Sequence, residues 1–386
     1  MALDAETFQQ LLETVERFVA ERLQPREAEV EESDRVPEEL IQEMRTLGLF
    51  GLSIPEGYGG LGLTMAEEAE VILRMGRTSP AFRSVFGTNV GIGSQALVID
   101  GTEEQRRAYL PGMAAGTLVG SFCLTEPSHG SDAGGLQTRA QRDGAGFRLN
   151  GTKRYITNAP RADLFTVMAR SNPDEPGGRG VSAFVVEARS EGIRLGKPEK
   201  KMGQRGAHVC DVVFEDCYVP AEAIIGGPAM EGQGFKTAMK VLDRGRLHIS
   251  ALACGLARRL IDDALAYAME RVQFGKPIAE HQLVQAMLAD CETECCAAEA
   301  LVRDTARRRD AGENTTKRVA AAKLMATEMV GRVADRAVQI HGGSGYIADY
   351  AVERFYRDVR LFRLYEGTSQ ILQLIVAREM IKEAGA

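Results

Sequence analysis

The chain has 386 residues, of which 44% are apolar and 26% charged, and its formal net charge is −7. This length exceeds one typical hydrophobic core, so two or three domains are expected. The acidic balance offers no electrostatic reason to bind nucleic acid or an anionic membrane surface. The composition therefore predicts a multidomain globular protein that has neither partner.

The first third of the sequence has helical periodicity. Apolar residues between 8 and 19 recur at i, i+3, i+4 and i+7, which indicates a helix with one apolar stripe, limited by Pro25. Helical patterns continue to Leu110, interrupted by a glycine-rich loop at 55–62. We therefore predict an N-terminal helical domain at residues 1–117.

The segment GIGSQA (residues 91–96) formally matches a dinucleotide-binding fingerprint, G-x-G-x-x-A. That fingerprint needs a strand before it and a helix after it, whereas both flanks are helical by pattern. We interpret its small residues as positions where another element packs close to a helix.

The pattern changes near Leu118 to short β-branched or aromatic runs separated by turn residues. Several short strands without helices between them indicate an antiparallel sheet or barrel rather than a doubly wound parallel sheet. Asn150-Gly151 is typical of a tight hairpin turn. We assign residues 118–230 to this middle domain, and its expected strands lie within 118–124, 147–157, 164–170, 180–188 and 208–219.

Long helical patterns return in the last third, which we assign to a C-terminal bundle domain at 231–386. The final helix is expected to begin at or after Thr368. The segment CETECC places Cys291 and Cys295 four residues apart, but no second ligand pair has zinc spacing. Buried small residues of a bundle are the better interpretation, and no metal site is expected. The other expected helices of this domain span 236–270, 280–310 and 317–341.

The N-terminal residues show no signal-peptide pattern, and no apolar run reaches the ~20 residues of a membrane span. Seven cysteines in a long chain fit a reducing compartment better than a disulfide framework. These features predict a cytoplasmic location.

Four segments are candidates for ligand binding. Residues 124–135 offer hydroxyl and backbone donors to a phosphate or a planar polar ligand, although composition alone favours a surface loop. Residues 154–160 end a strand, and 270–282 place Arg271 on a turn between helices, where a fixed cation suits a phosphate. Residues 339–346 have the alternative of a simple helix C-cap.

Seven motifs stand together in the order and spacing of the acyl-CoA dehydrogenase family, which the chain resembles over essentially its whole length. The motifs are FCLTEPSHGSD, RYITNA, KMGQRG, FEDCYVP, ERVQFGKPI, QIHGGSGY and YEGTSQI. The resemblance implies an N-terminal helical domain, a middle β-barrel and a C-terminal four-helix bundle. It also implies FAD as cofactor, an acyl-CoA substrate of fatty acid β-oxidation, an electron-transferring flavoprotein as acceptor, and a homotetramer built as a dimer of dimers.

The resemblance assigns site residues position by position. The residue matching Tyr155 is often tryptophan in the family, but tyrosine can still stack on a flavin. The implied FAD contacts are Phe122, Leu124, Thr125, Gly130, Ser131, Tyr155, Ile156, Thr157, Arg271, Gln273, Phe274, His281, Gln282, Gln339, Gly343, Thr368 and Gln370. The implied substrate contacts are Ser131, Asp243, Arg246, Gly367 and Arg378.

Glu366 matches the family's base, which removes the α-proton of the acyl-CoA while a β-hydride goes to the flavin. Burial would raise the pKa of such a carboxyl, and Gly367 would let the substrate approach the backbone. Some family members carry the base at the position of Gly245 instead, and glycine there agrees with a base at Glu366. Arg246 has the alternative of a structural ion pair.

The resemblance leaves other activities open. An acyl-CoA oxidase differs only in letting oxygen reach the reduced flavin. A non-redox lyase on this fold, such as a desulfinase, and a non-catalytic assembly factor are both disfavoured because Glu366 and the flavin positions are intact. The acyl group is expected to be medium to long, branched or terpenoid. Small residues on a helix that lines the acyl cavity predict room for about eight or more carbons, and these are Gly87, Gly91, Gly93, Ser94 and Ala96.

Overall fold

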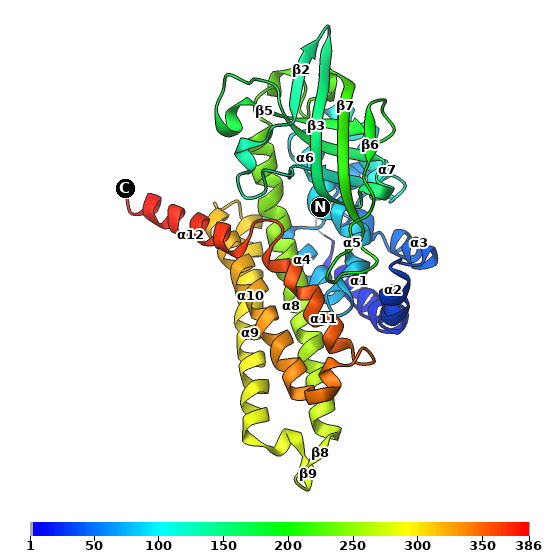
Figure 1. The fold of residues 1–386 in the computed structure, drawn as a ribbon, viewed down its shortest axis with the longest axis vertical. Helices are drawn as coiled ribbons and strands as arrows, with labels where there is room; N and C mark the ends of the chain where they lie inside the picture. The colour runs from blue at the N-terminus through cyan, green and yellow to red at the C-terminus, as the bar shows by residue number, and fades with distance from the viewer. Residues whose placement is uncertain (1–2, 386) are drawn as a thin grey trace.

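The computed structural model describes residues 3–385. A helical N-terminal part, a middle β-sheet and a C-terminal helical bundle follow one another, so the predicted order of domains is confirmed (Figure 1). The exact boundaries between the parts stay predictions. The N-terminal helices are α1 (Ala5–Phe18), α2 (Glu27–Ser33), α3 (Glu38–Thr46), α4 (Met65–Met75), α5 (Pro80–Thr88), α6 (Gln95–Asp100) and α7 (Glu103–Ala114).

The middle part is a seven-stranded sheet in which the strands are paired in the order β1-β4-β2-β3-β7-β6, with β5 on β4. Most pairs are antiparallel, as predicted, but β1 runs parallel to β4, and β2 meets β4 in parallel at one residue pair. Because the hairpin of β2 and β3 lies between β1 and β4 in sequence, β4 can pair with β1 while running in the same direction. The strands are β1 (Gly120–Cys123), β2 (Arg139–Asp143), β3 (Gly146–Thr157), β4 (Leu164–Arg170), β5 (Val181–Glu187), β6 (Ile193–Leu195) and β7 (Val209–Pro220).

The predicted hairpin turn at Asn150-Gly151 is wrong. Both residues lie inside β3, where the pairing with β7 shifts register and forms a bulge. The Asn150 side chain stabilises the bulge, because it donates to the Asp216 carboxylate and accepts from the Asp216 backbone N–H, both at 2.9 Å. The tight turn lies earlier, at Gly144, where φ is 56°. The Asn-Gly pair thus lies at a bulge and not at a hairpin turn, and glycine suits the backbone geometry of both.

The C-terminal part is built on α8, a helix of 37 residues that runs along the long axis of the molecule (Figure 1). The three long helices that the sequence predicts are confirmed to within two residues at each end, and the last helix begins directly after its N-cap residue Thr368. Its elements are α8 (Gly234–Glu270), β8 (Val272–Gln273), β9 (Lys276–Pro277), α9 (Gln282–Asp310), α10 (Thr316–His341), α11 (Ala351–Val359) and α12 (Ser369–Glu383).

The segment that resembled a dinucleotide fingerprint lies in a helical stretch, with a π-helical turn at Asn89–Gly93 between α5 and α6. A Cβ at Gly93 would stand 2.8 Å from the Gly120 carbonyl oxygen, so glycine lets this turn lie directly on β1. Asn89 fixes the same contact, because its Oδ1 accepts from the Gly120 N–H at 2.7 Å. The interpretation as a close-packing site is confirmed, and α5 is thereby held against the start of the sheet.

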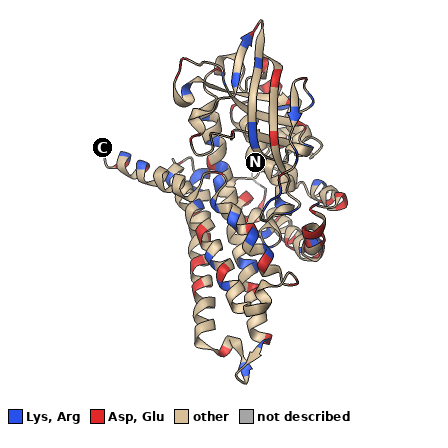
Figure 2. Ribbon diagram, viewed as in Figure 1, with Lys and Arg blue, Asp and Glu red and all other residues tan. Residues whose placement is uncertain are grey.

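A buried carboxylate ties the N-terminal helices to the bundle. Glu27 on α2 accepts from Arg354 on α11 at 2.8 Å, from Arg259 on α8 at 3.3 Å and from the Thr78 hydroxyl at 2.7 Å. A buried charge with this many partners favours one arrangement of the helices. Basic and acidic residues are interspersed along the helices of the bundle (Figure 2).

All seven cysteines are free thiols, and six of them are buried. Cys291 and Cys295 lie in the bundle core, as predicted, whereas Cys296 is exposed. Within residues 3–385, no helix is long and apolar enough to cross a membrane.

Candidate active site

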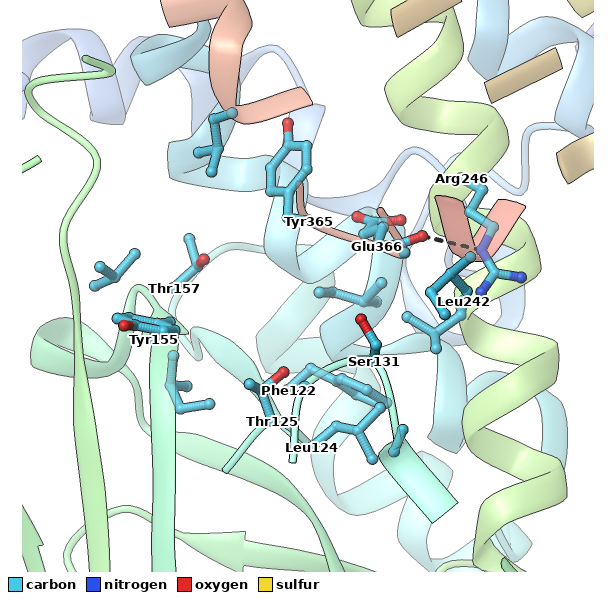
Figure 3. Close-up of a pocket in the computed structure, with 18 of the residues that line it drawn as sticks. Phe122, Leu124, Thr125, Ser131, Tyr155, Thr157, Leu242, Arg246, Tyr365 and Glu366 are labelled. Atoms are coloured by element: carbon cyan, nitrogen blue, oxygen red, sulfur yellow. Dashed lines mark hydrogen bonds between the residues drawn. The ribbon is translucent and has the colours of Figure 1, made fainter. Parts of the chain in front are cut away.

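A cavity of about 810 Å³ lies where the sheet, α5, α8 and the segment before α12 meet (Figure 3). One wall carries hydroxyl and aromatic side chains from the ends of β1 and β3. The opposite wall carries Glu366 and the α8 side chains Leu242 and Arg246 (Figure 3). The cavity is therefore assembled from residues far apart in sequence, and it separates the hydroxyl and aromatic groups from Glu366.

The loop after β1 is held by a buried ion pair. Lys153 donates to the Glu126 carboxylate at 2.8 Å and to the Leu124 carbonyl at 3.2 Å. The same carboxylate accepts backbone N–H groups of Gln137 at 2.6 Å and Thr138 at 2.8 Å. Because Glu126 binds the backbone at the far end of the loop, the polar residues between Glu126 and Gln137 are free to face the cavity.

Tyr155 lies at a second bulge of β3, where φ is 58°. This conformation turns its ring out of the strand, and the residue is 57% exposed beside the cavity. The Arg154 guanidinium lies over the Tyr155 ring, 5.0 Å from the ring centroid. An exposed aromatic face with hydroxyls of Thr125, Ser131 and Thr157 nearby suits a planar polar ligand (Figure 3).

Two buried cations hold the backbone around Glu366. Lys323 on α10 donates to the carbonyls of Tyr365 at 3.0 Å and Gly367 at 2.8 Å. Arg246 on α8 donates to the Glu366 carbonyl at 3.0 Å. Three consecutive carbonyls are thus bound from two helices, which holds Glu366 in a left-handed conformation with φ of 53°. A non-glycine residue at positive φ is strained, and such strain is concentrated at functional sites.

Glu366 is half-buried, but Oε2 of its carboxylate is fully buried and has no hydrogen-bond partner among the described residues. Burial raises the pKa of this carboxyl above its ordinary value. The positive charges of Arg83, Lys323 and Arg246 act in the opposite direction without cancelling the effect. A Cβ built at Gly245 would lie 2.3 Å from Oε2, so glycine there leaves room for the carboxylate.

Arg246 forms an ion pair and also lines the cavity, so the structural interpretation is confirmed and contact with the substrate stays a prediction. Its Nη1 donates to Asp243 at 2.8 Å, and Asp243 also accepts from the Thr316 hydroxyl at 3.2 Å. Asp243 is not part of the cavity lining. Its contacts with Arg246 and Thr316 fit a residue that supports the cavity wall, and a contact with the substrate stays a prediction.

The structure brings most of the predicted site residues together in this one cavity. The exceptions near it are Thr368, which caps α12 by accepting from the Ile371 N–H at 3.2 Å, and Gln370, which is exposed. The predicted residues that line the cavity are Phe122, Leu124, Thr125, Gly130, Ser131, Tyr155, Ile156, Thr157, Arg246, Glu366, Gly367 and Arg378.

The other predicted FAD contacts lie on the bundle and outside the cavity lining. Five of them lie between the end of α8 and the start of α9, where β8 and β9 form a small hairpin at the far end of the molecule (Figure 1). Phe274 in this hairpin is 94% exposed, with His281 packed at its edge. This second group is Arg271, Gln273, Phe274, His281, Gln282, Gln339 and Gly343, and we call it the distal group.

The helical stretch that carries the predicted small residues lines the cavity, but most of those small residues do not. Of the five, only Gly87 belongs to the cavity lining. The space above Gly87 and Gly91 is filled by the Arg83 side chain, whose Nε would lie 2.3 Å from a Cβ at Gly87. The length of the acyl chain stays a prediction.

Sequence reasoning missed Arg83, Lys323 and the pair of Glu126 with Lys153. Arg83 had a readable signal, since it is a lone cation in the apolar run PAFRSVFG with glycine four and eight residues later. Lys323 had a weaker one, as a lysine among the alanines of a buried helix face. Their partners could not be read from the sequence, because they come from other elements.

Comparison with known proteins identifies the chain's family. Models of the acyl-CoA dehydrogenase N-terminal, middle and C-terminal domains match residues 5–117, 121–217 and 232–381. The chain is 39% identical to a probable acyl-CoA dehydrogenase, YngJ, of Bacillus subtilis, covering 97% of this chain and 98% of the relative. It is 41% identical to acryloyl-CoA reductase (NADH) of Anaerotignum propionicum, covering 97% and 94%.

Among solved structures, butyryl-CoA dehydrogenase from Megasphaera elsdenii is similar over 99% of this chain and 100% of that chain. The TM-score is 0.93 at 34% sequence identity. Matches to all three domains and to whole relatives show the family directly. The chain belongs to the acyl-CoA dehydrogenase family, whose members are FAD-dependent oxidoreductases acting on CH–CH groups.

Proposed function

We propose that the protein oxidises the α,β carbon–carbon bond of an acyl-CoA thioester to a trans-2-enoyl-CoA, with Glu366 as the base. The observation that carries this proposal is the buried Glu366 carboxylate, which has one oxygen without a partner and faces a cavity. A carboxylate whose pKa is raised by burial is a stronger base than one in water. Glu366 would accept the α-proton on that free oxygen.

The residues opposite Glu366 fit the cofactor of the family. The exposed ring of Tyr155 offers a stacking face, and Thr125 and Ser131 offer donors beside it. When bound, FAD supplies the acceptor for the β-hydride. Phe122 and Leu124 are buried side chains of the same wall, and they would keep water from the reacting carbons.

The backbone of Glu366 has a second role in the proposal. The positive φ of Glu366 and Gly367 turns this segment, and no described residue accepts a hydrogen bond from the Glu366 N–H. That N–H is free to donate to the thioester oxygen, which would stabilise negative charge as the α-proton leaves. Arg246 and Lys323 would keep this donor in place by binding the neighbouring carbonyls.

The distal group supports an assembly. Its residues lie away from the cavity of their own chain, and the nearby Met269, Val272, Leu283 and Tyr346 are also exposed apolar side chains. We propose that this end packs against another subunit and reaches its FAD, within a homotetramer built as a dimer of dimers. An apolar, exposed tip fits an interface better than free solvent.

We further propose an electron-transferring flavoprotein as electron acceptor and fatty acid β-oxidation as the setting. A similar solved chain, from a structure described as an electron-transferring flavoprotein of Acidaminococcus fermentans, is 36% identical to this chain with a TM-score of 0.94. Because one relative is named a reductase, oxidation is the direction to be tested, and oxygen is the alternative acceptor. A cytoplasmic location stays a prediction, which cell fractionation tests.

The experiment is an anaerobic titration of the purified holoprotein. Acyl-CoA thioesters of different chains are added singly, flavin absorbance is followed, and the product is identified as the 2-enoyl-CoA. Electron transfer is then measured with an electron-transferring flavoprotein and, separately, with oxygen. Bleaching that yields the enoyl product supports the proposal. The proposed direction would be contradicted if no acyl-CoA reduces the bound flavin, while an enoyl-CoA reoxidises the flavin after it has been reduced chemically.

A further inference from the structure

The side chain of Arg83 on α5 is a buried cation at the cavity wall. The residue is 7% exposed and belongs to the cavity lining. Its Nε donates to the Nε2 of His248 on α8 at 2.7 Å. Its two terminal nitrogens have no hydrogen-bond partner among residues 3–385, and it makes no ion pair with a carboxylate of the described chain. A guanidinium stays protonated in proteins, so a full positive charge lies here without a counter-ion in contact.

A chain of buried side chains holds Arg83 without neutralising it. The pKa of His248 falls to about 4, because burial and the charge of Arg83 disfavour its protonation. The neutral ring accepts from Arg83 at Nε2 and donates from Nδ1 to the Glu68 carboxylate at 2.6 Å. Glu68 is itself ion-paired with Arg244. The negative charge of Glu68 is thus matched by Arg244, and the charge of Arg83 remains.

The backbone beneath Arg83 is shaped for the guanidinium. A Cβ at Gly87 would stand 2.3 Å from Nε, and a Cβ at Gly91 would stand 3.4 Å from one terminal nitrogen. Arg83, Gly87 and Gly91 follow at four-residue spacing, so the side chain lies along one face of the helical stretch. Glycine at both positions allows this placement, and a larger residue at 87 would expel the side chain.

The carboxylates that line the cavity do not pair with Arg83. Glu366 is close enough for the charge of Arg83 to lower its pKa, but the two form no ion pair. Asp132, the other acidic residue of the lining, is exposed on the loop after β1. A buried charge that is held in place but unpaired is costly, and a ligand carboxylate with two oxygens matches the two free nitrogens of a guanidinium.

We propose that Arg83 binds a carboxylate carried by the acyl group, so that the preferred substrate is the CoA thioester of a short dicarboxylic acid. This inference rests on the proposed function, since it says which chemical group the same substrate carries at the end of its acyl chain. Arg83 and Glu366 line one cavity, and Glu366 must touch the α-carbon, so the acyl chain has only to reach from one of these side chains to the other. This proposal replaces the expectation of eight or more carbons.

A different role for Arg83 makes a different prediction. If the guanidinium only lowered the pKa of Glu366, every acyl-CoA would feel its loss equally, and the acid limb of the pH profile would shift for all of them. If it binds a substrate carboxylate, the loss depends on that carboxylate. A pair of thioesters that differ only at the chain end separates the two roles.

The experiment compares adipyl-CoA with hexanoyl-CoA, and glutaryl-CoA with valeryl-CoA, by kcat/KM for flavin reduction in the wild-type holoprotein. Because a buried charge-assisted contact is at stake, the dicarboxylic thioester of the better pair should be preferred by roughly 30-fold or more. Arg83→Met should abolish that preference through a loss on the dicarboxylic thioester alone. Arg83→Lys should restore part of it. Arg378→Met, at an arginine of the same cavity that is 72% exposed at its side chain, should affect both thioesters equally.

The wild-type comparison needs no variant, so misfolding of Arg83→Met leaves the test intact; FAD content and Tm report the fold of each variant. A wild type that reduces its flavin with hexanoyl-CoA or valeryl-CoA at least as well as with the diacids refutes the inference and leaves the proposed function standing. An equal loss on both thioesters in Arg83→Met also refutes it. If no thioester of either kind reduces the flavin, the proposed function itself fails.

Discussion

Replacing Gly245 with alanine adds a single methyl group at the most sensitive point of the site. The new Cβ would lie 2.3 Å from Glu366 Oε2, whereas ordinary contact begins near 3.4 Å. The carboxylate must therefore withdraw by about 1 Å. A misplacement of that size can cost ~100-fold in rate. We expect flavin reduction by a saturating acyl-CoA to slow by about that factor.

Stability should not fall with activity in this variant. Alanine is favoured over glycine in a helix interior by about 1 kcal/mol, and the atoms that must move are side-chain ends, those of the Glu366 carboxylate and Cγ2 of Ile92 at 2.9 Å. The assay is stopped-flow reduction of the bound flavin without oxygen, with FAD content and Tm measured on the same sample. Gly57→Ala is the matched control, because a Cβ there meets nothing within 4 Å. Wild-type reduction in Gly245→Ala would show that Glu366 has no role at the reacting carbon.

Three further predictions concern charges and positions around the base. Lys323→Met removes a charge that lowers the pKa of Glu366, so the acid limb of the flavin-reduction rate should move to higher pH; an unmoved limb contradicts this. Burial raises the pKa of Asp358 to about 7, so the stability from this group is present below about pH 4 and lost as pH rises through about 7. Asp358→Asn, in which nothing titrates, should therefore exceed wild type in stability by on the order of 1–4 kcal/mol at pH 8, with a smaller gain at pH 5. The double change Glu366→Gly with Gly245→Glu should recover part of the rate that Glu366→Gly loses, since a side chain at 245 enters the space of the carboxylate.

The sequence predicted the helices of the bundle well, because each has a long apolar stripe that only a helix satisfies. The bounds of α8, α9 and α10 follow directly from that periodicity. The short strands β2 and β6 were missed, because β2 is mostly polar and the three residues of β6 are too few to show alternation. The turn at Asn150-Gly151 was misassigned because the same pair serves a bulge, and the partner Asp216 that decides between them is 66 residues away.

The candidate site divides in the same way. Residues that belong to contiguous motifs, such as Thr125, Tyr155 and Glu366, were predicted from the resemblance and lie together. Residues that act through distant partners were not. Arg83 is held by His248, which lies 165 positions later in the sequence. Because that contact could not be predicted, Gly87 and Gly91 were interpreted as leaving room for an acyl chain, whereas the Arg83 side chain fills this space.

The central claim is that Glu366 takes the α-proton. Glu366→Gln preserves size and the carbonyl contacts of the backbone, and it removes only the ability to accept that proton. The most direct measurement is the rate of flavin reduction by acyl-CoA in this variant, with FAD content confirmed to match wild type. The account predicts a loss of at least ~100-fold, the lower end of what a general base contributes. Reduction at the wild-type rate would contradict it.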